Sequence, residues 1–100
     1  MRLFLDDTRA FPKSGYQCVR DVKSAKILLE IMPFEFINLD YSMGKGLENG
    51  YDLLCWMKEK GIIVPRINIH SNNIIGKKRM EEFVKANFPE TTLTMNELPK

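Results

Sequence analysis

The 100-residue sequence contains no long hydrophobic run, no repeat and no low-complexity segment. No apolar stretch approaches the roughly 18 residues that a membrane-spanning helix needs. The amino terminus lacks the long apolar core of a signal peptide. We therefore expect a cytoplasmic protein that does not contact a membrane.

Cysteine and histidine are both scarce. The two cysteines, Cys18 and Cys55, lie far apart and show neither a CxxC motif nor the spacing of a metal site. We expect them to be buried thiols in a reducing cytoplasm. His70 is the only histidine of the chain.

Neither sign of charge dominates, because 15 Lys and Arg face 13 Asp and Glu and leave a net charge of +2. This charge is too small to indicate binding to duplex nucleic acid. The hydrophobic content of 44% and the charged content of 28% are ordinary for a soluble globular protein. The length predicts one domain over residues 1–100. It does not indicate an oligomeric state.

The sequence does contain an alternation of apolar runs and helical patterns. Short apolar runs predict strands near residues 1–5, 16–20, 34–39, 62–69 and 91–95. Apolar residues at helical spacing predict helices over residues 21–32, 50–61 and 74–86. The order β-β-α-β-α-β-α-β predicts a parallel sheet with right-handed crossovers.

The link between the first two predicted strands contains no helix. Pro12, Ser14 and Gly15 mark it as a loop. A parallel crossover usually needs a dozen or more residues. Residues 6–15 just span that return, since an extended residue covers roughly 3.3 Å. The sequence leaves a parallel and an antiparallel second strand both open.

Polar residues that bind metals or phosphates follow three of the predicted strands. Asp6 and Asp7 follow the first, Asp40 the third, and His70 and Ser71 the fourth. These strand ends converge at one edge of a parallel sheet, where such folds bind ligands. Three carboxylates predict a site for Mg²⁺, or for Mn²⁺. A neutral imidazole beside them predicts acid–base catalysis near pH 7.

Each of these features also has a purely structural interpretation. Adjacent aspartates are typical of a solvated strand-to-turn junction, as well as of a metal site that offsets the repulsion between Asp6 and Asp7. A histidine at a strand end, such as His70, is often satisfied by backbone carbonyls. The sequence leaves these alternatives open.

A cluster of cations near the start of the third predicted helix indicates an anion site. Lys77, Lys78 and Arg79 oppose the helix dipole there, and helix N-termini bind phosphates. Gly50 opens the second predicted helix and would let a phosphate approach its backbone closely. For the lysines, a solvated face balanced by residues 81–82 is an equal alternative.

Four stretches of the chain resemble the cyclic-phosphate-processing receiver-like domains, an offshoot of the response-regulator receiver superfamily. They are Leu3–Arg9 with Pro12, Leu39–Asp40 with Gly44, Gly50–Asp52 with Trp56, and Ile69–Asn73 with Gly76 and Met80. The resemblance implies a receiver/flavodoxin-like three-layer α/β sandwich. It would have about five mostly parallel strands and three helices, with the first crossover helix missing.

The resemblance also implies a divalent-metal-dependent phosphoesterase. Its ligand would be a small cyclic phosphate, a phosphorylated nucleotide or an RNA end. Carried over by position, Asp6, Asp7 and Asp40 would hold the metal. Arg9 would contact the phosphate, and His70 would transfer the proton, so that His70, Asp40 and Arg9 form the catalytic set. The predicted phosphate-binding set is Arg9, Gly50, Ser71, Asn73, Lys77 and Arg79.

The chain departs from these patterns at two places. After Asp40 the family usually has a histidine and then an aspartate, where this chain has Tyr41 and Ser42. The loss motivates an alternative, a catalytically silent module that binds a nucleotide or a partner protein. The phosphate-binding lysine of true receivers has no counterpart near Met95, which argues against aspartyl-phosphate signalling.

Overall fold

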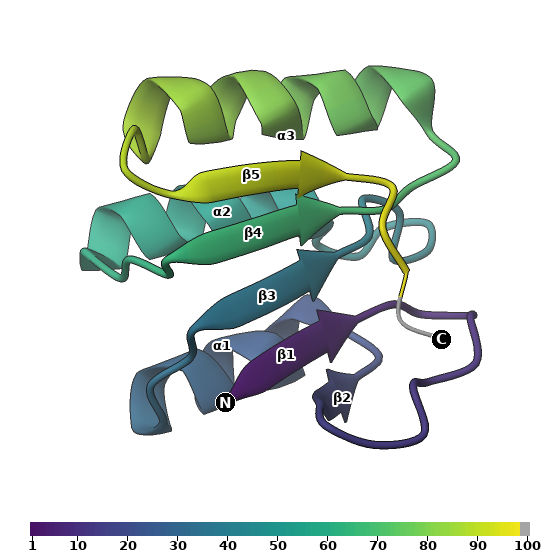
Figure 1. Cartoon of the computed structure of the whole chain (residues 1–100). Helices are drawn as coiled ribbons and strands as arrows, with labels where there is room; N and C mark the ends of the chain where they lie inside the picture. Colours follow the sequence, from purple (N-terminus) through teal and green to yellow (C-terminus); the bar gives the residue numbers. More distant parts are fainter. Residues whose placement is uncertain (99–100) are drawn as a thin grey trace.

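Five parallel strands form one sheet in the computed structural model, which describes residues 1–98 (Figure 1). The strands are β1 (Arg2–Leu5), β2 (Gln17–Val19), β3 (Phe36–Leu39), β4 (Arg66–Ile69) and β5 (Thr92–Met95). They pair in the order β2-β1-β3-β4-β5. All four pairings are parallel, which decides the orientation of the second strand that the sequence left open.

Three helices connect the strands from β2 onward, close to the predicted positions. They are α1 (Val22–Ile31), α2 (Gly50–Lys60) and α3 (Ile74–Asn87). Asp21, Asn49 and Asn73 cap them, each side chain accepting a hydrogen bond from the N–H three residues further on. Within residues 1–98, no helix is both long and apolar enough to cross a membrane.

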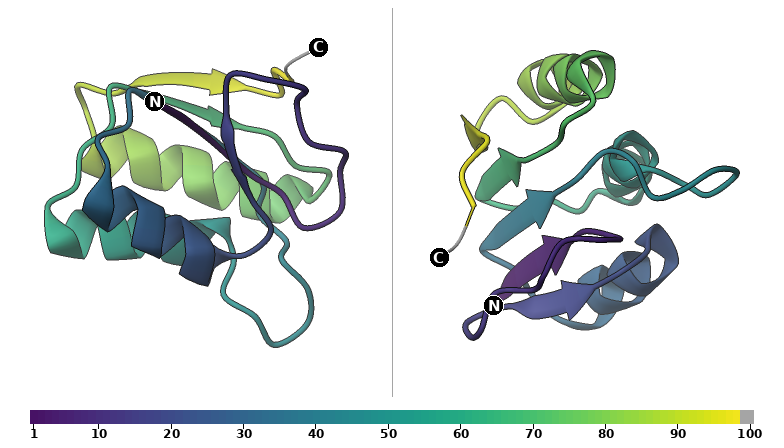
Figure 2. Two further views of the ribbon diagram at one scale, coloured as in Figure 1. Left: turned by 90° about the horizontal axis from the view of Figure 1, so that it is seen from below. Right: turned by 90° about the vertical axis from the view of Figure 1, so that its right-hand side faces the viewer.

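All three helices cover the same face of the sheet (Figure 2). From β2 onward, each connection steps in the same direction across the sheet, so right-handed crossovers place every helix on one face. The step from β1 to β2 runs the other way, and its loop lies on the opposite face (Figure 2). The receiver-like α/β fold class is confirmed. The implied third layer of helices is corrected, because this loop and residues 96–98 lie on that face and no helix of the described residues does.

The alternating side chains of the strands separate an apolar core from a more polar face. One set packs against the helices and is fully buried, namely Leu3, Leu5, Ile37, Leu39, Ile67 and Ile69. The other set includes Phe4, Asn38 and Asn68, which are also buried. Phe4 contacts Phe11 and Tyr16 of the loop edge-on, with ring centroids 6.3 and 6.0 Å away. The loop is therefore held by aromatic packing over β1.

Replacing Asp21 by alanine is expected to lower the free energy of unfolding by about 1 kcal/mol at neutral pH, because α1 loses its N-cap. The Asp21 Oδ1 atom accepts the Ser24 N–H at 2.8 Å. Hydrogen bonds from Ser24 lower the pKa of Asp21 below its ordinary 3.8. The cap therefore contributes fully above that value and is lost as the pH falls through the folded-state pKa.

Urea unfolding at neutral and acidic pH measures this effect. Glu30→Ala, an exposed change on the same helix, is the control. A cost that stays constant as the pH falls below 3.8 would contradict the assignment of the cap to the charged carboxylate.

Candidate metal and phosphate site

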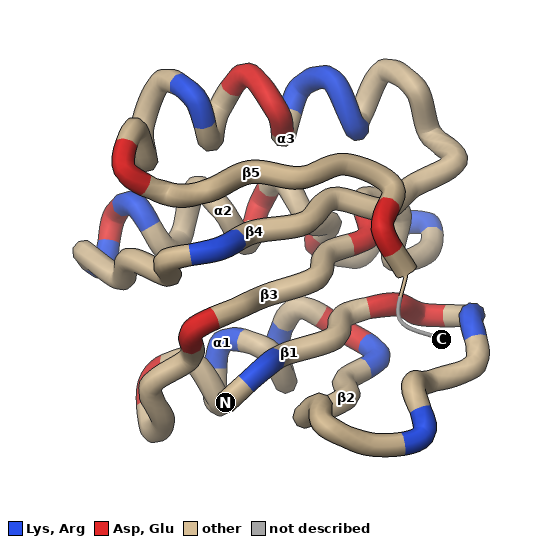
Figure 3. The backbone as a smooth tube through the Cα atoms, viewed as in Figure 1, with Lys and Arg blue, Asp and Glu red and all other residues tan. Residues whose placement is uncertain are grey.

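The register of the sheet places three acidic or basic side chains side by side at the carboxyl ends of the strands. Leu5 pairs with Leu39, and Leu39 with Ile69. The residues that follow them are Asp6, Asp40 and His70. Among the described residues, these three form a group whose possible ligand atoms lie within 4.8 Å of one another. Figure 3 shows the acidic residues after β1 and β3 at the same edge.

Asp6 is fully buried and held by hydrogen bonds on both carboxylate oxygens. Oδ1 accepts the backbone N–H groups of Thr8 and Arg9 at 2.9 and 2.8 Å. Oδ2 lies 2.8 Å from His70 Nε2 and 3.2 Å from Arg9 Nε. Burial alone raises the pKa of Asp6, but the N–H groups of Arg9 and Thr8 and the His70 side chain together hold it below its ordinary value. Asp6 is therefore a carboxylate at neutral pH.

Asp40 is half-buried beside it and accepts the Tyr41 N–H at 2.7 Å through Oδ1. Burial, together with the charge of Asp6, raises the pKa of Asp40, against the opposing hydrogen bonds from Tyr41 and Ser71. The two carboxylates repel each other, so the pair favours a nearby cation. Arg9 is the cation that the protein itself places there.

His70 lies behind Asp6, with only 1% of its surface exposed. Its ring stacks on Phe4, with centroids 5.0 Å apart. Nδ1 is 2.6 Å from Asn38 Oδ1, and Nε2 faces Asp6. Burial lowers the pKa of His70, although Asp6 and Asp40 act in the opposite direction. Both ring nitrogens therefore contact side chains. The alternative interpretation of the sequence, in which backbone carbonyls satisfy this histidine, does not hold.

Asn38 and Asn68, which sequence reasoning missed, continue this network. The Asn68 amide donates to Asn38 Oδ1 at 2.8 Å, and both asparagines donate to the Glu97 carbonyl. They occupy matching positions of β3 and β4. A polar amide in the middle of each apolar strand was the signal in the sequence that would have indicated them.

An open cleft lies beside Asp40 at the carboxyl edge of the sheet, and the buried Asp6 is not part of its lining. Its lining combines carboxylates, hydroxyls, amides and one guanidinium, from Asp7, Thr8, Arg9, Asp40, Ser42, Ser71, Asn72 and Asn73. The predicted phosphate ligands Arg9, Ser71 and Asn73 are thus brought together. Asp7 lines the cleft as well, outside the group formed by Asp6, Asp40 and His70.

Gly50, predicted to let a phosphate approach closely, is not among the residues that line this cleft. Its N–H donates to the Tyr41 carbonyl at 2.9 Å. A Cβ atom at Gly50 would collide with the Asp40 carbonyl oxygen and lie 2.6 Å from Met80 Cε. The glycine is needed because α2 begins directly against the backbone after β3.

Lys77 and Arg79, also predicted to bind phosphate, do not line the cleft either. Lys77 Nζ donates to Asn96 Oδ1 at 3.0 Å. The Arg79 guanidinium lies over the Tyr51 ring, 3.9 Å from its centroid, on the side where α3 meets α2. Lys77 and Arg79 are two residues apart, which is about 200° around the helix axis at 3.6 residues per turn. They therefore face different sides of α3, and a cluster in sequence is not a cluster in space.

Tyr41 packs away from the cleft. Its ring lies against Gly76, where a Cβ atom would collide with it, and it borders the apolar core. Ser42, the next residue, lines the cleft. Of the two residues that depart from the family pattern, only Ser42 therefore changes the polar lining.

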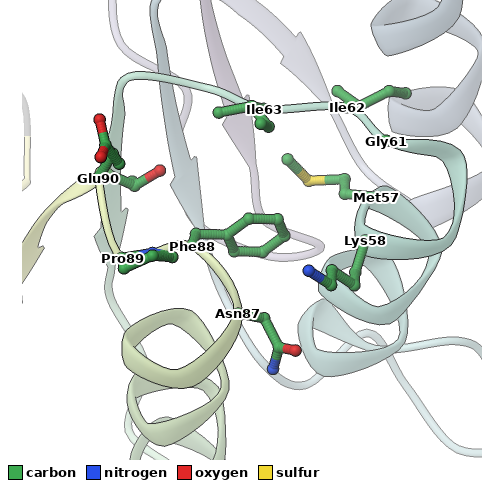
Figure 4. Close-up of a pocket in the computed structure, with 10 residues that line it drawn as sticks. Met57, Lys58, Gly61, Ile62, Ile63, Asn87, Phe88, Pro89 and Glu90 are labelled. Atoms are coloured by element: carbon green, nitrogen blue, oxygen red, sulfur yellow. The ribbon is translucent and has the colours of Figure 1, made fainter.

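A second cavity lies at the opposite edge of the sheet, between the ends of α2 and α3 (Figure 4). Its walls include Met57, Ile62 and Phe88, with Glu90 at its rim. It contains neither a histidine nor a pair of carboxylates, so it lacks the donor set of a metal or phosphate site.

Comparison with known protein families agrees with this geometry. Residues 1–86 match the family described as the cyclic-phosphate processing receiver domain. This region includes Asp6, Asp40 and His70. No curated protein and no solved structure is significantly similar to the chain.

Proposed function

The chain belongs to the cyclic-phosphate processing receiver domain family, and we propose that it is a divalent-metal-dependent phosphoesterase acting on a cyclic phosphate or a phosphorylated nucleotide. The observation that carries this proposal is the group formed by Asp6, Asp40 and His70 beneath a cleft that contains Arg9. The family supports cyclic phosphates as the ligand class.

The donor set fits a divalent cation, because two carboxylates offer hard oxygen ligands within 4.8 Å of each other. Asp6 and Asp40 would hold the ion, with Asp7 within the same cleft. A bound ion would polarise the phosphoryl group and activate a water molecule. Mg²⁺ and Mn²⁺ are the ions expected from the oxygen ligands.

The residues of the cleft would bind and orient the phosphoryl group. Arg9 offers guanidinium donors to the phosphate oxygens, where charge develops during hydrolysis. The hydroxyls of Ser42 and Ser71 line the same cleft. Proton transfer by His70 stays a prediction, since its Nε2 faces the cleft only through Asp6.

Hydrolysis of 2′,3′-cyclic nucleotides in the presence of Mg²⁺ or Mn²⁺ tests the proposal. We expect turnover that EDTA abolishes and that Asp40→Asn reduces at least about 100-fold, because the variant loses charge where the transition state needs stabilisation. Glu59→Gln, an exposed carboxylate change on α2, is the control.

The second candidate is the silent module that binds a nucleotide or a partner protein. Ser42 favours it, because this residue lines the cleft where the family usually places an aspartate. Nucleotide binding without turnover under any of these metals would support this candidate and contradict the phosphoesterase.

A further inference from the structure

The amide of Asn68 has one possible orientation, because both of its ends meet the backbone of Glu97. Nδ2 lies 2.6 Å from the Glu97 carbonyl oxygen, and Oδ1 lies 3.3 Å from the Glu97 N–H. A backbone N–H only donates and a carbonyl only accepts. A flipped amide would place donor against donor and acceptor against acceptor. The hydroxyl of Thr94, 2.7 Å from Oδ1, agrees with the same orientation.

The orientation of Asn68 in turn determines that of Asn38. Asn68 Nδ2 is a donor and lies 2.8 Å from the Asn38 side-chain amide. The Asn38 atom that accepts this hydrogen bond is therefore the oxygen Oδ1. Asn38 Nδ2 then donates to the Glu97 carbonyl at 3.2 Å. The same Asn38 Oδ1 lies 2.6 Å from His70 Nδ1. Because an amide oxygen only accepts, His70 Nδ1 must carry the hydrogen.

A neutral imidazole with its hydrogen on Nδ1 has a lone pair on Nε2. In this protein that lone pair points at Asp6 Oδ2 from 2.8 Å. Two lone pairs that face each other at this distance repel, so the pair Nε2 and Oδ2 favours a cation between them. Both side chains are buried, and an Asp40 oxygen lies within 4.8 Å of them.

We propose that His70 Nε2 is a metal ligand, together with Asp6 and Asp40, and that this centre takes a transition-metal ion such as Zn²⁺ through the imidazole. Metal-ligating histidines donate their other ring N–H to a carbonyl or carboxylate that fixes the tautomer. Asn38 Oδ1 has that position here. Imidazole suits Zn²⁺, whereas Mg²⁺ prefers oxygen ligands alone. The ion would lie between Nε2 and Oδ2, and any proton bound there would pass to solvent.

This inference rests on the proposed function only for the presence of a metal at the site. The inference can be tested without measuring catalytic turnover. His70 is the only histidine, so ¹⁵N-histidine labelling gives the ring signals of one residue. In the metal-free protein we expect a protonated Nδ1. On titration with ZnCl₂ we expect the Nε2 resonance to move to that of a metal-bound nitrogen, while Nδ1 stays protonated. Asp40→Asn should weaken this response.

Variants distinguish the residue proposed to bind the metal, His70, from the residue that orients its ring, Asn38. His70→Gln should lower the affinity for Zn²⁺ at least about 100-fold and that for Mg²⁺ much less, since Mg²⁺ does not need the imidazole. Asn38→Ser, which removes the acceptor for Nδ1, should lower the Zn²⁺ affinity about 10–100-fold. Thr94→Val is the matched control, because the Glu97 backbone still orients Asn68. Amide NMR spectra report whether each variant folds, and the ring measurement on the unmodified protein is independent of them.

Zn²⁺ binding without a shift of Nε2, or an unprotonated Nδ1 in the metal-free protein, would overturn the inference and leave the proposed function standing. Zn²⁺ coordinated by His70 without hydrolysis of any cyclic phosphate would overturn the proposed function alone. No saturable binding of Zn²⁺, Mn²⁺ or Mg²⁺ up to millimolar concentration would overturn both.

Discussion

Replacing Asp6 by alanine is expected to lower the free energy of unfolding by about 3–5 kcal/mol, the usual cost of breaking a buried charged pair. The change removes the acceptor of the Thr8 and Arg9 N–H groups and leaves His70 Nε2 without a partner. Asp6→Asn is expected to cost less than about 1.5 kcal/mol. Its oxygen keeps both N–H groups, and its new amide hydrogen donates to the Nε2 lone pair.

Urea unfolding of the two variants, followed by the fluorescence of Trp56, measures this difference. Both variants should also lose the response of His70 to metal. Asp7→Ala is the neighbouring control, expected within about 0.5 kcal/mol of the unmodified protein because its side chain is partly exposed. If Asp6→Asn were as unstable as Asp6→Ala, the hydrogen would lie on Nε2 and not on Nδ1.

Gly50→Ala is expected to destabilise the protein by about 3 kcal/mol, at the upper end of the cost of overpacking. At an open helical position the same change would stabilise by up to about 1 kcal/mol. Here the new Cβ meets the Asp40 carbonyl oxygen and Met80 Cε. Backbone atoms cannot rotate away, so either α2 or the chain after β3 must move. A displaced Asp40 would also weaken metal binding.

Thermal and urea unfolding of Gly50→Ala test this, with the exposed Lys60→Ala on the same helix as control. The double variant Gly50→Ala/Met80→Ala separates the two obstacles. If removal of the Met80 side chain restored most of the lost stability, the side chain and not the Asp40 backbone would be the obstacle. Unchanged stability of Gly50→Ala alone would contradict the close packing of α2 on β3.

Local patterns and one topological rule were enough to predict most of the fold and the centre of the candidate site. Apolar runs and helical spacing indicated the strands and helices, because burial of one face is encoded residue by residue. The rule that parallel strands end at one edge placed Asp6, Asp40 and His70 together. The structure brings these three within 4.8 Å.

Local patterns did not determine which way each predicted phosphate-binding residue faces. Gly50 and Arg79 were chosen because glycines and cations near helix starts favour anions. The direction in which each one faces depends on what packs beside it: the Asp40 backbone for Gly50, and the Tyr51 ring for Arg79. Arg9 does line the cleft, because Asp6 fixes its loop locally.

By itself, then, the sequence determined the strands and helices and the meeting of two carboxylates with an imidazole. Only the tertiary structure decided that β2 is parallel, that one face of the sheet lacks helices, and that His70 is buried behind Asp6. It also decided the tautomer of His70, through Asn38, Asn68 and the backbone of Glu97, which lies 29 residues after Asn68. These outcomes depend on the register of the strands, on the handedness of the crossovers and on the direction of hydrogen bonds between distant segments. No local pattern of residues encodes these relations.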